Sequence, residues 1–190
     1  WRLGYGKPKS GVNRLEKTFT MRRGQSALDV HVKTFNHGQK AMPVGLRIHP
    51  AWNVGGDADP EDRWIARKQG KPTTFKHPFK FSQPAEGDWT ALVDRDKRMA
   101  VIISYQPDIV ETLYTCGSTP SYNLELFATL KEVPPEKSQD FRYTLAYIRG
   151  LSGLTAYQNG VAANIDMLSP DVLGHGAKLR FDLEIGSIRA

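Results

Sequence analysis

Two residues of this sequence have the side chains that acid–base chemistry needs. His49 closes the alternating segment 44–49, which has the period of a half-buried strand. Pro50 has no backbone N–H and ends the hydrogen-bonded ladder, so we expect His49 at the mouth of a sheet. There it can act as a general acid or bind a hydroxyl group. On this segment alone, an edge histidine that bonds a loop carbonyl is the favoured alternative.

Glu125 is the second candidate, because Leu124 and Leu126 must point to the opposite face of a strand predicted over 122–130. A carboxylate on a concave, partly dry face can serve as a general base, although a solvated strand residue is the simpler reading of Glu125 alone. The expected substrate-binding residues are polar or aromatic and lie near His49 in the sequence: His31, Lys33, Arg47, Trp52 and Asn53.

The elements that must position these residues are short strands separated by turn signals about every ten residues. This spacing predicts an all-β fold, an antiparallel β-sandwich of about a dozen strands. The clearest predicted strands are 15–21, 28–35, 44–49, 89–94, 99–104, 109–114, 122–130, 141–147 and 179–185. If the register allows it, the polar faces of 28–35 and 44–49 coincide and bring His31 and Lys33 beside His49.

One short helix is predicted over 60–69. Asp59 is a good N-cap, Pro60 suits the first helical position, Asp62 can close a capping box, and Gly70 can end the helix. No repeat or linker divides the chain, so we expect one domain over 1–190. The first residue is a tryptophan, and we expect the domain to be part of a longer protein.

The composition narrows the classes of partner. The 190 residues carry a formal net charge of +6, which favours an anionic partner, but the charge is dispersed and a nucleic acid is the weakest such partner. No apolar run is long enough to span a membrane. The single cysteine, Cys116, excludes an internal disulfide framework and leaves the compartment open, with a periplasmic or secreted location favoured.

No cofactor motif is present, and we predict no metal site. The acidic stretch 57–62 does not have the spacing of a calcium loop, and Asp59 is better explained as a helix cap. Five aromatic residues are candidates for stacking on a sugar ring, with Trp52 first among them and most of the others expected in the core: Trp52, Trp64, Trp89, Tyr105 and Tyr122.

Two stretches carry a family resemblance. The segment 36–53, with Pro43 and His49-Pro-Ala-Trp-Asn53, resembles the galactose mutarotase-like (aldose 1-epimerase-like) β-sandwiches, as does Asn123-Leu-Glu125 followed by 134–138 and an alternating strand. The resemblance implies that His49 is a general acid that protonates the ring oxygen. It also implies that Glu125 is the base that removes the anomeric proton, from the other side of C1.

The sequence departs from that family in several ways. It has Pro-Ala-Trp where the family has Pro-Tyr-Phe, and the family's N-terminal arginine and additional histidine have no counterpart here. We therefore expect an isomerase- or lyase-related domain that binds or processes a sugar, and the basic Arg47 and Lys33 suit a uronate. The alternative is a non-catalytic supporting domain of a polysaccharide lyase or glycoside hydrolase. Such a domain would have His49 and Glu125 far apart and apolar patches where another domain docks.

Overall fold

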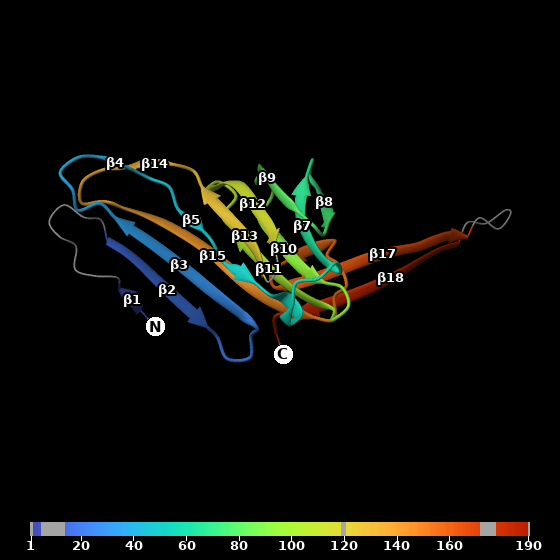
Figure 1. Ribbon diagram of the computed structural model, residues 1–190. Helices are drawn as coiled ribbons and strands as arrows, with labels where there is room; N and C mark the ends of the chain where they lie inside the picture. Colours follow the sequence, from blue (N-terminus) through green and yellow to red (C-terminus); the bar gives the residue numbers. More distant parts are fainter. Residues whose placement is uncertain (1, 5–13, 119–120, 172–177, 190) are drawn as a thin grey trace.

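The computed structural model describes residues 2–4, 14–118, 121–171 and 178–189. Two antiparallel sheets pack face to face, and a hairpin near the C-terminus lies against the outside of the larger sheet and extends beyond it (Figure 1). Every strand pairing in the described residues is antiparallel. The prediction of an all-β antiparallel sandwich is confirmed.

The larger sheet has the strand order β1-β2-β3-β15-β11-β10-β7-β8 and is called the large sheet below. Its strands are β1 (Arg2–Gly4), β2 (Arg14–Met21), β3 (Ala27–Phe35), β15 (Ser138–Arg149), β11 (Met99–Tyr105), β10 (Trp89–Asp94), β7 (Asp62–Lys68) and β8 (Lys71–Lys76). The predicted hairpin of 89–94 and 99–104 is confirmed, because β10 and β11 pair around the charged turn 95–98.

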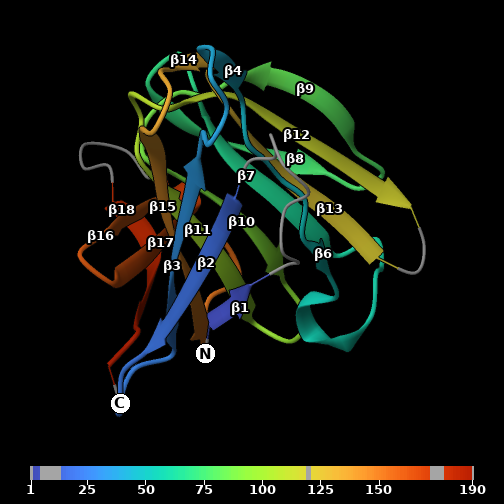
Figure 2. The same ribbon diagram turned by 90° about the vertical axis from the view of Figure 1, so that its left-hand side faces the viewer.

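The second sheet, called the small sheet, has the order β5-β13-β12-β9, with β6 also paired to β13 (Figure 2). Its strands are β5 (Arg47–Ile48), β6 (Ala51–Trp52), β13 (Ser121–Ala128), β12 (Val110–Ser118) and β9 (Lys80–Pro84). Two further pairings complete the described fold: β4 (Met42–Val44) with β14 (Lys131–Val133), and β17 (Val161–Asp171) with both β16 (Ala156–Gln158) and β18 (Lys178–Ser187).

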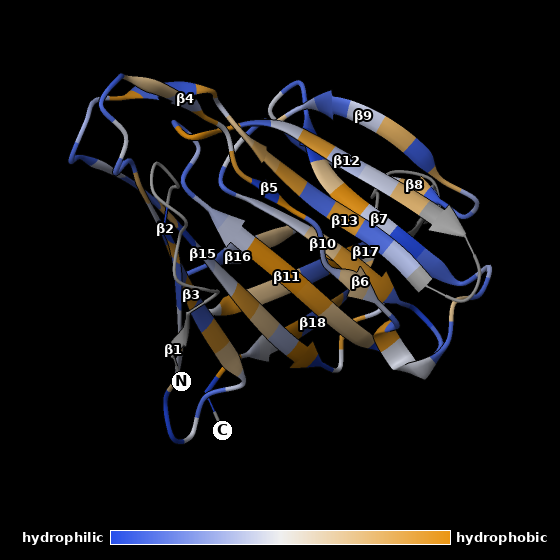
Figure 3. Cartoon of the chain, turned by 60° about the vertical axis from the view of Figure 1, so that its left-hand side comes forward, coloured by the Kyte–Doolittle hydropathy of each residue, from blue (hydrophilic) through white to orange (hydrophobic). Residues whose placement is uncertain are grey.

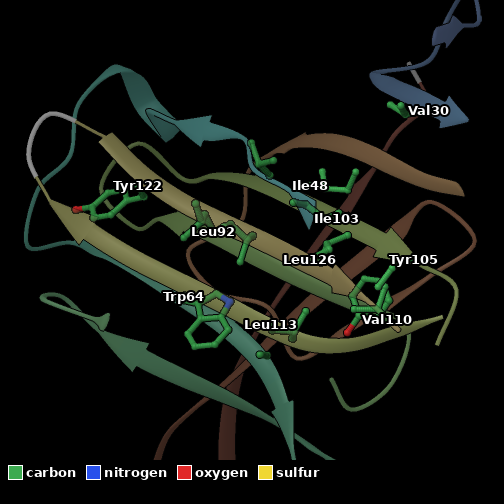
Figure 4. Packing of buried hydrophobic residues seen from close by; sticks show 14 of the residues in the cluster. Val30, Ile48, Trp64, Leu92, Ile103, Tyr105, Val110, Leu113, Tyr122 and Leu126 are labelled. Carbon is green, nitrogen blue, oxygen red and sulfur yellow. The ribbon is translucent and has the colours of Figure 1, made fainter. Parts of the chain in front are cut away.

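The main core lies between the inner faces of the two sheets. Trp64 and Leu92 of the large sheet meet Leu113, Tyr122 and Leu126 of the small sheet there (Figure 4). Figure 3 shows apolar positions along the strands of both sheets. A second core lies on the outer face of the large sheet, where β16–β18 and the segment 151–154 cover β7, β10, β11 and β15. The middle of the large sheet is therefore buried on both faces.

The predicted helix over 60–69 is wrong, because Asp62–Lys68 is strand β7. The residues that predict a helix cap form a turn instead. Asp62 accepts a hydrogen bond from the Asp59 backbone N–H, as in a capping box, and the chain then enters the sheet as β7. Gln69 and Gly70 both have positive φ and form the tight turn to β8. Since β7 is buried on both faces, it lacks the polar alternation that marks a strand. No helix in the described ranges is long and apolar enough to cross a membrane.

The polar faces of 28–35 and 44–49 do not coincide. β3 pairs with β2 and β15 in the large sheet, whereas β5 pairs with β13 in the small sheet. The chain crosses between the sheets through β4. Val30 and Ile48 both point into the shared core from opposite sides, so the polar residues beside them point to opposite outer faces of the sandwich.

Four of the five candidate stacking aromatics are core residues, since Trp64, Trp89, Tyr105 and Tyr122 are all buried. Trp64 shows why: its indole N–H donates to the Thr90 hydroxyl at 2.7 Å, and its ring stacks on Phe75 and Phe81.

Gly55 ties the loop after β6 to the large sheet. It lies in the single helical turn of the described residues, η1 (Val54–Gly56), with φ of 80°, and a Cβ built there would lie 1.8 Å from Asp94 Oδ2. Gly56 also has positive φ, but no atom of the described ranges lies within 4 Å of a Cβ built there.

We expect Gly55→Ala to lower the free energy of unfolding by at least about 2 kcal/mol, because it adds a clash to the strain of positive φ. Gly56→Ala should cost only about 1 kcal/mol, from φ alone. Urea unfolding of both variants compares them. Equal losses would show that the contact with Asp94 contributes nothing.

Candidate functional site

The structure places His49 directly opposite Glu125. Ile48 pairs with Leu126 and Ala51 with Asn123, so β5 and β6 follow one register along β13 with His49 and Pro50 between them. The ladder breaks only there. Because residues opposite each other in a sheet share a face, both His49 and Glu125 point to the outer face of the small sheet.

Glu125 is fully buried although it lies on an outer face. Arg47 covers it from the diagonal position, and its Nε donates a hydrogen bond to Glu125 Oε2. This hydrogen bond raises the pKa of Arg47 above its ordinary value. The Arg47 guanidinium also lies over the ring of Phe127 at 5.2 Å, while half of the side chain stays exposed to solvent. Glu125 is thus a buried carboxyl group in contact with a half-exposed cation.

His49 covers the other carboxylate oxygen. Its Nε2 lies 3.0 Å from Glu125 Oε1 and 3.1 Å from the side-chain amide of Asn123, and the side chain is 48% exposed. The approach to Oε1 does not have hydrogen-bond geometry, and no group in the described residues donates a hydrogen bond to Oε1. A single ring nitrogen cannot accept from Asn123 and donate to Glu125 at once. Whether Nε2 carries a proton therefore decides which of the two groups it can bond.

The remaining residues predicted for this site are not brought to it. Trp52 pairs with Tyr122 and shares its inward face, where it lines an apolar cavity with Leu28, Leu145 and Tyr147. Asn53 is exposed and precedes η1, with no side-chain hydrogen bond to the turn. Strand alternation explains the position of Trp52, because consecutive residues of β6 point to opposite faces, whereas Asn53 lies beyond the end of β6.

His31 and Lys33 lie on the outer face of the large sheet, on the other side of the sandwich. His31 contacts Asp140 of β15, and the Lys33 ammonium lies 5.1 Å from the centre of the Phe35 ring. Both side chains therefore have their contacts within the large sheet and not at Glu125.

Three further residues border the site and are not predicted from the sequence: Asn123, Phe127 and Tyr114. Asn123 and Phe127 lie two residues on either side of Glu125, so period-two alternation alone indicates that they share its face. Tyr114 pairs with Glu125 from β12, and only the register of the sheet shows this.

The acidic stretch 57–62 is used in structural contacts. Asp57 contacts Lys97, and Asp59 and Asp62 bond backbone amides in the turn before β7. Among the described residues, no group of three or more His, Cys, Asp or Glu side chains is placed to hold a metal ion.

Comparison with known proteins gives no matching family model and no matching curated protein. Solved structures do match. A candidate aldose 1-epimerase from Escherichia coli K12 superposes with a TM-score of 0.59 at 13% identity, over 77% of this chain and 64% of that one. The chain has the galactose mutarotase-like fold. A galactose mutarotase-related enzyme from Lactobacillus acidophilus (TM-score 0.54, 10% identity, 71% of this chain and 61% of that one) agrees. So does a galactose mutarotase-like protein from Lactobacillus casei (TM-score 0.52, 14% identity, 71% and 63%).

The mutarotase-like fold confirms the resemblance at the level of architecture. This chain spans somewhat over three fifths of the length of these three structures. At these identities the likeness concerns the fold, and the chemistry of the site must be argued from its own residues.

Proposed function

We propose that the outer face of the small sheet binds a sugar at Arg47, His49 and Glu125, and that Glu125 and His49 exchange protons with it. The observation that carries this proposal is Glu125 Oε1, a buried carboxylate oxygen that accepts no hydrogen bond from the described part of the chain and lies beneath a half-exposed histidine. Leaving such an acceptor unpaired is unfavourable, and a sugar hydroxyl is a donor that would pair with it. The mutarotase-like fold supports a sugar as the class of ligand.

The contact between the two side chains sets a condition on this proposal. At 3.0 Å, no sugar ring fits between His49 and Glu125, so the histidine must turn outward to admit one. Its exposure and its position in the gap between β5 and β6 leave room for this rotation. Glu125 then takes the proton of the anomeric hydroxyl as the bond from C1 to the ring oxygen breaks, and His49 gives its proton to that oxygen. Reversal on the other face of the aldehyde yields the other anomer.

An acidic sugar is the finer part of the proposal. Only Nε of Arg47 bonds Glu125, so the terminal guanidinium nitrogens remain able to pair with a uronate carboxylate. His31 and Lys33 lie on the other sheet, so the charge argument rests on Arg47.

The second candidate is a non-catalytic domain that supports a lyase or glycoside hydrolase. The observation in its favour is the contact with Arg47, which covers Glu125 and occupies one of its two carboxylate oxygens. The contact between His49 and Glu125 speaks against it, because a supporting domain has no need to bring them together.

The test is the rate of exchange between anomers, measured by NMR magnetisation transfer on galactose and on galacturonate with the full chain. We expect faster exchange with the protein, and His49→Asn should remove about 99% of the acceleration, the lower range for a lost proton donor. His31→Asn makes the same change on the other sheet and should have no effect.

Saturation-transfer binding measured in the same samples separates the candidates. Binding without faster exchange would favour the supporting domain and contradict the proton transfer. If galactose and galacturonate bind equally at low and high salt, Arg47 does not select an acidic sugar.

A further inference from the structure

The hairpin of β17 and β18 presents an apolar face to solvent. Five of its large side chains are 48% to 65% exposed: Val161, Ile165, Phe181, Leu183 and Ile185. The cross-strand pairs Ile165–Leu183 and Ala163–Ile185 place them on one face of the pair, here called the hairpin face. Outside the hairpin, Met21 and Leu130 are the other large apolar residues found exposed in the described ranges. Such a concentration on one element indicates a binding surface.

The opposite face of the hairpin is already occupied. Ala162 and Asn164 are buried there, and Glu184 accepts hydrogen bonds from Ser152 and Asn164. Arg98, from the turn between β10 and β11, pairs with Glu184 at 2.8 Å. These contacts fix the hairpin against the large sheet, so the hairpin face must point away from the body of the protein.

We propose that the hairpin face binds the same face of a second copy of this chain. The six residues at positions 161, 163, 165, 181, 183 and 185 are all uncharged, so two copies meet without opposing like charges. A two-fold axis makes such a surface complementary to itself. Figure 1 shows the hairpin extending beyond the rest of the molecule, which leaves space for a second hairpin to stack on it.

The area is sufficient for a weak dimer. Five half-exposed large side chains offer on the order of 500 Å² per copy, and two stacked faces would bury on the order of 1,000 Å². This is about the smallest area at which specific association occurs. Pairing of two β18 edges would also join two copies but would leave the apolar side chains in water, so face-to-face stacking is the arrangement that the residues favour.

The test is sedimentation velocity on the full chain from about 1 to about 100 µM, the range in which a small interface dissociates. We expect a monomer–dimer equilibrium. Leu183→Lys places two charges in each dimer and should raise the dissociation constant about 100-fold or more. Met21→Lys, a change at a side chain that is 73% exposed on β2, is the matched control and should associate like the unchanged protein.

Circular dichroism should show that both variants keep the fold, since both side chains are exposed in the monomer. A monomer at all concentrations would overturn the proposal. A dimer that Leu183→Lys leaves intact would overturn it as well, because association would then use a different surface. Neither result depends on sugar binding at Glu125.

Discussion

Replacing Glu125 with glutamine is expected to slow catalysed anomer exchange by about 100- to 10,000-fold, the usual contribution of a general base. Glutamine has nearly the same shape, and its amide oxygen can still accept the hydrogen bond from Arg47 Nε, so the fold should persist. The amide cannot take a proton at neutral pH. Magnetisation transfer on galactose measures the loss directly.

Glu111→Gln is the matched control, because Glu111 is an exposed residue of β12 in the same sheet. It should leave the exchange rate unchanged. If Glu125→Gln keeps its rate, the proton is taken by another group, and the buried carboxylate has only a structural role as the partner of Arg47.

Asp62→Asn is expected to stabilise the protein at neutral pH. Burial raises the pKa of Asp62 to about 6, and the backbone amide of Asp59 lowers it only in part. Asp94, directly opposite on β10, is buried too and adds like charge. The folded state therefore holds the Asp62 proton more tightly than the unfolded state, whose carboxyl titrates at about pH 4. The stability due to this proton is present below about pH 4 and is lost as the pH rises to about 6.

At pH 7 the cost to the unchanged protein is about 3 kcal/mol, since the pKa differs by about two units. The asparagine side chain of the variant carries no charge and avoids this cost, so the two proteins should be similar at pH 4 and differ by up to that amount at pH 7. Urea unfolding at a series of pH values measures the difference. Asp96→Asn, in the exposed turn after β10, should show no such trend. A constant difference at every pH would exclude titration of Asp62 as its source.

The sequence predicts the fold well where strands alternate. Segments 28–35 and 141–147 alternate between apolar residues that face the main core and mostly polar residues on the outer face, and their patterns match strands β3 and β15. The sequence pattern is misleading at Asp62–Lys68, where it predicts a helix and the structure has a strand. There, burial on both faces removes the alternation, and a turn uses the residues that usually begin and end a helix. Local propensity gives way to the packing of β7 between its neighbours.

Local sequence patterns are also insufficient to predict the candidate site. Residue type identifies His49 and Glu125, but their contact depends on a register between segments far apart in the chain, which no local pattern sets. The same applies to His31 and Lys33, which lie close to His49 in the sequence and on the far side of the sandwich in the structure. Trp52 lies close to His49 in the sequence, but strand alternation directs its side chain into the core.

The break at His49 and Pro50 also bears on aggregation. β5 and β6 form an edge of the small sheet, and an unpaired edge is a template on which other chains can add strands. Pro50 interrupts the pairing with β13 and divides this edge into two segments of two residues. Such short edge segments are poor templates for an added strand. The interruption that leaves His49 between two short strands thus also keeps the edge short, and we expect replacement of Pro50 to make the protein more prone to form intermolecular β-structure during refolding.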